Sequence, residues 1–375
     1  MTAMEPPGGL AAFTGIAAEA LWLRPLGLLR GAAAQAMIAS SDAVALAGGT
    51  LGFSLVEALA LRDGRLLSAA TTLAALRRWA AGQDEAVAER VAAQLASLAA
   101  PRPPWAGLPL DRPLIMGVLN VTPDSFSDGG DFVDPAVAIA AGRAMLVQGA
   151  DIIDIGGEST RPGAAPVSPE AESARVVPVI AALAGAGAVV SVDTRHGAVM
   201  EAALAKGARI VNDVSALTGD RASRAIVARA GAAIVLMHMK GEPGTMQNEP
   251  VYADAPLEVA AYLAERIADC TAAGIAADRI VVDPGIGFGK RKAHNLEILE
   301  RLALLHALGR GILLGVSRKS LIGALTNIVA PKERLGGSLA GALYGLSQGV
   351  NILRVHDVAA TRQAVAVWQG IAEAT

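Results

Sequence analysis

One pattern of hydrophobic and polar positions recurs in the second part of the chain. A segment with helical spacing ends at a glycine, and a short apolar run follows at residues 149–153, 207–211, 231–235 and 349–353. Glycine after a helix suits the left-handed C-cap that ends it, and an unbroken apolar run is typical of a parallel strand buried on both faces. The pattern therefore predicts alternating helices and strands.

Apolar runs of this kind predict eight strands. They start near residues 114, 151, 188, 208, 232, 279, 311 and 350, and each is followed by room for a helix. Asp134 and Pro135, for example, form a good N-cap and first-turn pair. Eight such units in about 260 residues meet the requirement of a TIM (β/α)8 barrel, an α/β fold. The alternative is an open doubly wound sheet, but the Gly-rich dinucleotide turn that usually follows its first strand is missing.

A proline-rich stretch at residues 101–104 separates this barrel from the start of the chain. Proline disfavours helix and sheet interiors, so we interpret the stretch as a linker between residues 1–105 and 106–375. Apolar side chains at helical spacing predict an amphipathic helix through Val87 and Leu98, and another near Leu73. We expect a small, mostly helical N-terminal extension of unknown role, because no catalytic constellation lies in it.

Composition limits the possible partners. Hydrophobic residues make up 53% of the chain, enough for a sizeable core, and the net charge of −3 comes without any block of like charge. These features exclude a footprint for nucleic acid or for an anionic membrane, so we expect small-molecule partners. A single cysteine, Cys270, and an N-terminus without a secretion signal favour the cytoplasm, with no membrane span.

Polar residues follow nearly every predicted strand. An Asp after a strand, such as Asp213 or Asp357, is often only a helix N-cap, and the glycines of residues 285–289 suit a tight turn. Such explanations work for single residues but not for polar ends on nearly all strands. In a barrel these ends meet at the C-terminal mouth, where barrel enzymes carry out their chemistry. The segments are 120–124, 156–163, 193–194, 212–213, 237–239, 283–290, 317–320 and 354–357.

Cationic donors in these segments suit a phosphorylated ligand. Arg161, Arg354 and His356 are suited to a di- or triphosphate, and the amide oxygen of Asn120 could complete a hydrated Mg²⁺ shell. We therefore expect Mg²⁺ as a cofactor.

A second group suits a flat heterocycle. Asp193, Asp283 and Asn212, with Lys319 opposite, match a ring edge that displays N–H or NH₂ groups and a carbonyl. A buried carboxylate is tolerated there because the ligand satisfies its oxygens. A pyrophosphorylated heterocycle fits both groups.

The motifs at these strand ends closely resemble those of the dihydropteroate synthases. They are NVTPDSFSDGG, GGESTRPG, SVDT, NDVSAL, DPGIGFGK, GVSRKS and RVHDV, in this order, and the resemblance covers roughly residues 112–375. It implies that 6-hydroxymethyl-7,8-dihydropterin pyrophosphate and p-aminobenzoate condense to dihydropteroate and pyrophosphate, with Mg²⁺. The long first loop, residues 120–130, is then expected to fold with residues 160–162 over the pyrophosphate.

The resemblance also implies a role for each matched residue. The catalytic group is expected to be Arg161, Lys319, Arg354 and His356. The pterin contacts are expected to be Asp193, Asn212, Asp283 and Lys319. The pyrophosphate contacts are Arg161, Arg354, His356 and, through the metal, Asn120, and Thr160 also lines the substrate site. The p-aminobenzoate walls are Phe126, Pro162, Phe288 and Ser320. One local departure is Arg195-His196, where the family often has a small residue and Lys. We also expect a homodimer.

Two other functions compete with this one. A pterin-binding methyltransferase barrel would share the Asp and Asn contacts but would not need a pyrophosphate cradle such as Arg161, Arg354 and His356. A non-catalytic paralogue would be expected to have lost part of the motifs, and here they are intact.

Overall fold

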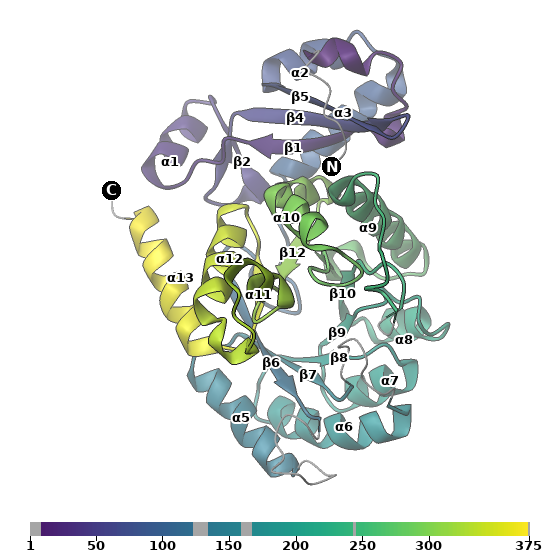
Figure 1. Cartoon of the computed structure of the whole chain (residues 1–375), viewed down its shortest axis with the longest axis vertical. Coiled ribbons are helices and arrows are strands. Elements are labelled where there is room, and N and C mark those ends of the chain that lie inside the picture. Colours follow the sequence, from purple (N-terminus) through teal and green to yellow (C-terminus); the bar gives the residue numbers. More distant parts are fainter. Residues whose placement is uncertain (1–8, 123–133, 159–166, 243–244, 374–375) are drawn as a thin grey trace.

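The computed structural model describes residues 9–122, 134–158, 167–242 and 245–373. Its larger part is a closed barrel of parallel strands in the order β10-β11-β12-β13-β6-β7-β8-β9 (Figure 1). The predicted TIM barrel is confirmed, and the strands begin at or close to the predicted positions. They are β6 (Leu114–Asn120), β7 (Ile152–Gly156), β8 (Val190–Asp193), β9 (Ile210–Asp213), β10 (Ala233–Met237), β11 (Ile280–Asp283), β12 (Gly311–Leu314) and β13 (Ile352–Val355).

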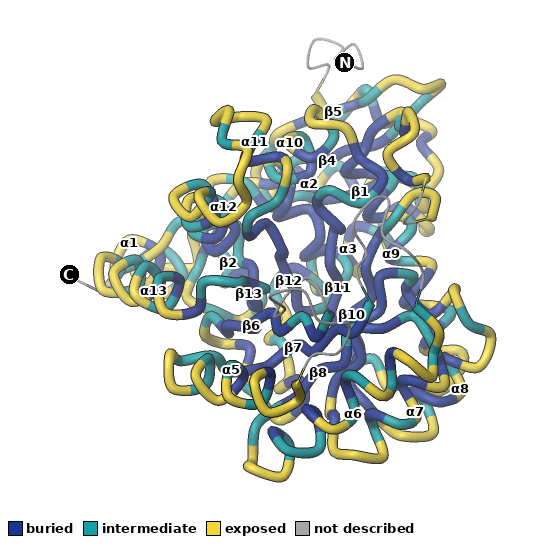
Figure 2. Tube along the Cα trace, turned by 60° about the horizontal axis from the view of Figure 1, so that its bottom comes forward, coloured by how far each residue is buried: buried dark blue, intermediate teal, exposed yellow. Residues whose placement is uncertain are grey.

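Helices surround this barrel. Figure 2 shows the strands buried at the centre and the outer faces of the helices exposed. The α-helices are α5 (Pro135–Val147), α6 (Pro169–Gly185), α7 (Gly197–Ala205), α8 (Ser223–Ala230), α9 (Ala255–Ala272), α10 (Lys292–Glu300), α11 (Ser320–Thr326), α12 (Leu335–Ser347) and α13 (Val358–Glu373). The short 3₁₀ helices are η4 (Ala277–Arg279), η5 (Leu302–Leu308) and η6 (Pro331–Glu333). Within the described part of the chain, no helix is long and apolar enough to cross a bilayer.

Local signals in the sequence set the helix ends. The Asp134 carboxylate accepts a hydrogen bond from the backbone N–H of Ala136 across 2.8 Å and caps α5, as predicted. Gly231 ends α8 in the left-handed conformation, with φ of 60°, which costs glycine nothing and other residues about 1 kcal/mol. The chain then turns directly into β10.

An apolar cluster fills the barrel at the N-terminal ends of its strands. Trp105 is fully buried in this cluster, among residues such as Leu114, Ile210 and Leu313. Its indole N–H donates to the carbonyl oxygen of Arg279, just before β11, across 2.8 Å. This end of the barrel is therefore closed, and the polar mouth lies at the other end.

The N-terminal extension contains a sheet as well as helices. The predicted helices are present as α2 (Leu73–Ala80) and α3 (Glu85–Ala99), but a three-stranded antiparallel sheet in the order β1-β4-β5 was not predicted. The remaining elements are η1 (Gly9–Phe13), η2 (Ala18–Ala20), β1 (Trp22–Leu26), α1 (Gly31–Ala39), β2 (Val44–Ala45), η3 (Leu46–Gly48), β3 (Gly52–Phe53), β4 (Leu55–Arg62) and β5 (Arg65–Thr72).

This extension packs against the barrel near η5, away from the mouth (Figure 1). Arg24 on β1 forms ion pairs with Glu57 of the extension and Glu300 of the barrel, each at 2.7 Å. In the proline-rich stretch, Arg102 donates to the carbonyl oxygen of His306 across 3.2 Å. The extension thus covers part of the barrel surface without reaching the strand ends that carry the candidate site.

Candidate active site

Strand pairing places four of the predicted positions in one row across the mouth. Asn120 on β6 pairs with Gly156 on β7, Gly156 pairs with Asp193 on β8, and Asp193 pairs with Asn212 on β9. Residues that pair directly across neighbouring parallel strands point to the same face of the sheet. The row therefore brings Asn120, Asp193 and Asn212 together at the mouth.

Arg354 on β13 crosses the barrel to reach this row. Its Nη2 donates to Asp193 Oδ2 across 2.6 Å, and its Nε donates to Asp154 Oδ2 across 2.6 Å. The same Asp154 oxygen accepts a hydrogen bond from Asn212 Nδ2 across 3.0 Å. One buried carboxylate thus holds two of the predicted site residues.

Asp154 was not predicted as a site residue. It lies in the middle of β7 and is fully buried, and its second oxygen, Oδ1, has no hydrogen-bond partner. A signal was present in the sequence, because Asp154 interrupts an otherwise apolar strand, and a buried charge needs a partner. Asp154 was missed because it lies in the middle of its strand and not at the strand end.

Asp283 and Lys319 lie on the opposite side of the mouth. Asp283 Oδ1 accepts a hydrogen bond from the backbone N–H of Gly285 across 2.7 Å. Lys319 donates to the carbonyl oxygen of Ile286, and its Nζ lies 4.8 Å from the centre of the Phe288 ring. The structure therefore brings the predicted Asp283, Lys319 and Phe288 together around one turn.

The ionisable groups of the mouth have shifted pKa values. Burial raises the pKa of Asp193 to about 7, against the opposing effect of Arg354, and burial also raises the pKa of Asp283. Burial lowers the pKa of Lys319 to about 8, partly offset by Asp283. Such shifts concentrate at sites where a ligand completes the charge balance.

His356 and Ser320 are the remaining predicted site residues that lie within the described part of the chain. His356 Nδ1 lies 3.1 Å from Ser317 Oγ, which fixes the ring beside the start of the seventh loop. Ser320 is exposed as the first residue of α11, directly after Lys319. Ser317 was not predicted to be part of the site, and we see it as the residue that orients His356.

Lys290 and His238 have a structural role in the turn below Asp283. Lys290 Nζ lies 2.9 Å from His238 Nδ1 and donates to the carbonyl oxygens of His238, Gly285 and Phe288 at 2.8–3.1 Å. Burial lowers the pKa values of both residues. These contacts give His238 a structural role in holding the turn.

Arg195 and His196, which depart from the family pattern, each pair with a carboxylate. Arg195 forms a two-point pair with Glu158 at 3.0 and 3.1 Å, and His196 Nδ1 lies 2.8 Å from Glu172 Oε2. Glu158 also accepts a hydrogen bond from the backbone N–H of Val167 across 3.2 Å. Arg195 and His196 therefore both have carboxylate partners in this structure.

Four predicted site residues, Phe126, Thr160, Arg161 and Pro162, lie outside the described residues. Within the described ranges no group of three His, Cys, Asp or Glu side chains is arranged to hold a metal ion. Asn120 contributes one amide oxygen at the end of β6. Mg²⁺ usually keeps several waters and takes much of its coordination from substrate phosphates, so this single donor fits a metal bound mainly through the ligand.

Comparison with known proteins gives the family. Residues 116–356 match the model of the pterin binding enzymes. The chain belongs to this pterin-binding enzyme family. It is 51% identical over 267 residues to a dihydropteroate synthase of Neisseria meningitidis, a match that spans 70% of this chain and 94% of that protein.

Solved structures of this family agree. Xanthomonas albilineans dihydropteroate synthase with 4-aminobenzoic acid superposes with a TM-score of 0.67 at 47% identity, covering 71% of this chain and 96% of that one. The same enzyme in complex with 7,8-dihydropteroate gives a TM-score of 0.65 at 44% identity, covering 70% and 95%. The family match begins at Met116, so the N-terminal extension lies outside it.

Proposed function

We propose that the chain is a dihydropteroate synthase, which joins 6-hydroxymethyl-7,8-dihydropterin pyrophosphate to p-aminobenzoate and releases pyrophosphate. The relatives support the reaction. The main structural support is the group of Asp193, Asn212, Asp283, Lys319 and Arg354, which places hydrogen-bond acceptors and donors together at the C-terminal ends of the strands. Asp154 holds two members of this group in place.

The pterin is the ligand that these groups fit. Asp193 and Asp283 accept hydrogen bonds from its N–H and NH₂ groups, Asn212 does so through its amide oxygen, and Lys319 donates to its ring acceptors. Burial raises the pKa values of both carboxyls, and ligand N–H donors offset that cost by bonding the ionised form.

The pyrophosphate lies at the cationic side of this group. Arg354 and His356 donate to its oxygens, and Arg161 and Thr160 are proposed to add further contacts. Asn120 and the phosphate oxygens would hold Mg²⁺, which would neutralise part of the leaving group's charge. Arg354 carries a guanidinium whose pKa is raised further by its carboxylate partners Asp154 and Asp193, so it stays charged throughout.

The p-aminobenzoate packs against Phe288 and Ser320, with Phe126 and Pro162 as the proposed remaining walls. During reaction the C–O bond between the pterin methylene and the pyrophosphate breaks, and its electron pair leaves with the pyrophosphate. The pterin ring delocalises the positive charge, the amine nitrogen attacks the methylene carbon, and the nitrogen loses one proton. Rate enhancement comes from positioning and from stabilising the leaving charge.

A direct assay tests this function. The full chain with the pterin pyrophosphate, p-aminobenzoate and Mg²⁺ is expected to release dihydropteroate and pyrophosphate in equal amounts. Asp283→Asn, which puts a donor where the pterin needs an acceptor, is expected to cost about 2–4 kcal/mol of pterin binding. Asp278→Asn, at the exposed N-terminal side of the same strand, is the matched control and is expected to leave binding unchanged.

This assay, together with a methyl-transfer assay, separates the rivals. Pterin binding without dihydropteroate formation would overturn the proposal and indicate the non-catalytic paralogue. Methyl transfer from a methylated pterin to a corrinoid protein would indicate the methyltransferase barrel. Formation of dihydropteroate that depends on Asp283 excludes both.

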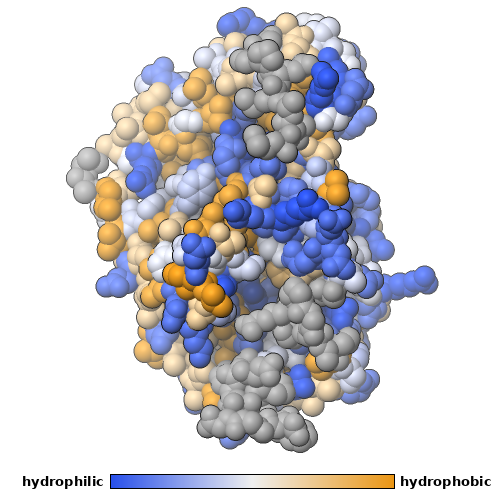
Figure 3. Space-filling model, in the orientation of Figure 1, coloured by the Kyte–Doolittle hydropathy of each residue, from blue (hydrophilic) through white to orange (hydrophobic). Residues whose placement is uncertain are grey.

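We also propose that the enzyme is a homodimer. Apolar side chains are exposed on and between α10, α11 and α12, and Figure 3 shows hydrophobic residues gathered over this face. Leu296, Leu325 and Tyr344 line a cavity of about 480 Å³ among these helices. The exposed members are Leu296, Leu325, Val329, Leu335 and Tyr344. Sedimentation of the chain and of Leu325→Glu is expected to show a dimer and a monomer, respectively.

The reaction is proposed to take place in the cytoplasm. The thiol of Cys270 is fully buried in α9, and burial raises its pKa. A lone, buried thiol that cannot form an internal disulfide is compatible with a reducing compartment. Fractionation of the cells that make the protein tests the location.

A further inference from the structure

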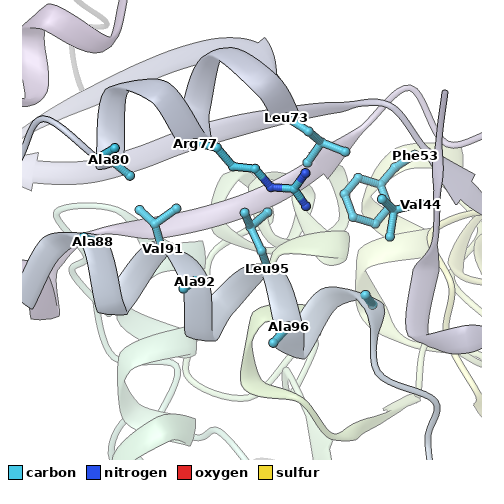
Figure 4. Close-up of a pocket in the computed structure, with 12 residues that line it drawn as sticks. Val44, Phe53, Leu73, Arg77, Ala80, Ala88, Val91, Ala92, Leu95 and Ala96 are labelled. Carbon is cyan, nitrogen blue, oxygen red and sulfur yellow. The ribbon is translucent and has the colours of Figure 1, made fainter. Parts of the chain in front are cut away.

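A pocket in the N-terminal extension lies outside the family match and away from the barrel mouth. It opens between α2 and α3 and is closed at one end by β2 and β3 (Figure 4). Its volume is about 580 Å³. Sites for small organic ligands typically measure about 300–1,000 Å³, so the pocket has the size of a ligand site.

The walls of the pocket are almost entirely apolar. Phe53, Val91 and Ala80 are buried and form its floor, while Leu73 and Leu95 face each other from the two helices. Alanines on the facing side of α3 leave the space open, because a larger side chain at any of them would fill it. They are Ala88, Ala92, Ala96 and Ala99.

Arg77 is the charged residue in this lining. Figure 4 shows its guanidinium between the two helices, near Leu95 and Phe53. Within the described part of the chain Arg77 has no hydrogen bond or ion pair. Two other arginines of the extension do have partners, since Arg24 pairs with two glutamates and Arg90 lies over the Trp22 ring while donating to a carbonyl oxygen.

We propose that this pocket binds a small amphipathic carboxylate, a molecule with one carboxylate and an aliphatic or aromatic tail. The carboxylate pairs with Arg77, whose planar fork matches two carboxylate oxygens. The tail lies against Leu95, Val91 and Phe53 and removes their apolar surface from water. The proposal concerns residues outside the barrel, so it does not depend on the proposed function.

The chemistry of the lining selects this class among alternatives. A nucleotide or another polyphosphate needs several cationic or backbone donors, and the lining offers one guanidinium. A cationic ligand would be repelled by Arg77. A second copy of this chain would need a broad apolar face, whereas the floor residues here lie recessed between two helices (Figure 4).

Calorimetric titration of the full chain with decanoate tests the proposal. Saturable binding of one decanoate per chain is expected. Arg77→Gln removes the charge and Ala92→Leu fills the pocket, and each is expected to weaken binding about tenfold or more, a loss of about 1.4 kcal/mol or more. Arg78→Gln and Ala93→Leu, the adjacent positions outside the lining, are the matched controls and are expected to bind decanoate like the parent.

Four results would overturn it. The first is the absence of saturable decanoate binding by a folded chain. The second is equal weakening by each variant and its control, which would mean non-specific association with the surface. The third is binding of decyltrimethylammonium as strongly as decanoate. A change of sedimentation coefficient caused by Ala92→Leu would instead show that a second copy covers the pocket, which also contradicts the proposal.

Discussion

Arg354 and Asp154 form an ion pair across 2.6 Å although they lie 200 positions apart in the sequence. Asp154 also accepts from Asn212, so its loss should affect both partners. Asp154→Asn keeps the shape but cannot accept from both donors with a charged oxygen. We expect pterin affinity to fall by about 1.5–3 kcal/mol, the usual worth of hydrogen bonds to charged groups, measured by calorimetry with the pterin alone.

Asp151→Asn is the matched control for this change. Asp151 also pairs with arginines, Arg112 and Arg362, but it lies at the other end of the barrel, just before β7. Its replacement should lower stability against urea and leave pterin affinity as it was. If the two variants lower pterin affinity equally, Asp154 has only a general structural role.

The shifted pKa values of Asp193 and Lys319 predict a bell-shaped pH profile of kcat/KM for the pterin substrate. The raised pKa of Asp193, about 7, means that the acceptor form is lost as the pH falls through 7. The lowered pKa of Lys319, about 8, means that its charge is lost as the pH rises through 8. Activity should therefore be highest between these values, where both groups are charged.

Lys319→Arg tests the alkaline side of this profile. Arginine stays protonated over the whole pH range, so the fall in kcat/KM above pH 8 should disappear. This holds even if the variant is slower than the parent enzyme. Lys292→Arg, an exposed lysine at the start of α10, should leave the profile unchanged. An alkaline limb that persists in Lys319→Arg would assign it to another group.

The barrel could be predicted from sequence because its signals are local. A glycine after a helix and an apolar run after the glycine mark four of the strands, apolar runs alone mark the others, and the polar ends then follow from the direction of the strands. The pairing of Arg354 with Asp154 and Asp193 could not be predicted in the same way. It depends on which side chains of distant strands share a layer, which is fixed only when the barrel closes.

The sheet of the extension was missed for a different reason. Residues 55–62, LVEALALR, are rich in Leu, Ala and Glu, which favour helices, and lack strict alternation. Tertiary pairing with β1 and β5 overrides that preference. The useful signal was Asp63-Gly64, a two-residue connection with both φ angles positive, which is typical of a β-hairpin turn.

Gly285 is expected to be essential to the turn that holds Asp283. Its φ is 66°, and a Cβ at this position would overlap the carbonyl oxygen of His238. Gly285→Ala should lower the free energy of unfolding by about 1–2 kcal/mol for the backbone and by about 1–3 kcal/mol more for the overlap. Gly274→Ala, at φ of 92° with open space around it, should show the backbone cost alone. Equal losses in urea unfolding would contradict the overlap.

We propose that the barrel is a separate unit that functions without the N-terminal extension. The site residues and the family match lie in the barrel, so a fragment of residues 101–375 should keep a turnover close to that of the full chain. It should be less stable, because the extension covers η5 and pairs with Glu300. A fragment of residues 106–375 also lacks the fully buried Trp105 and should lose about 3–5 kcal/mol more. Circular dichroism and the condensation assay decide between the alternatives: a folded 101–375 fragment without activity would make the extension part of the catalytic unit.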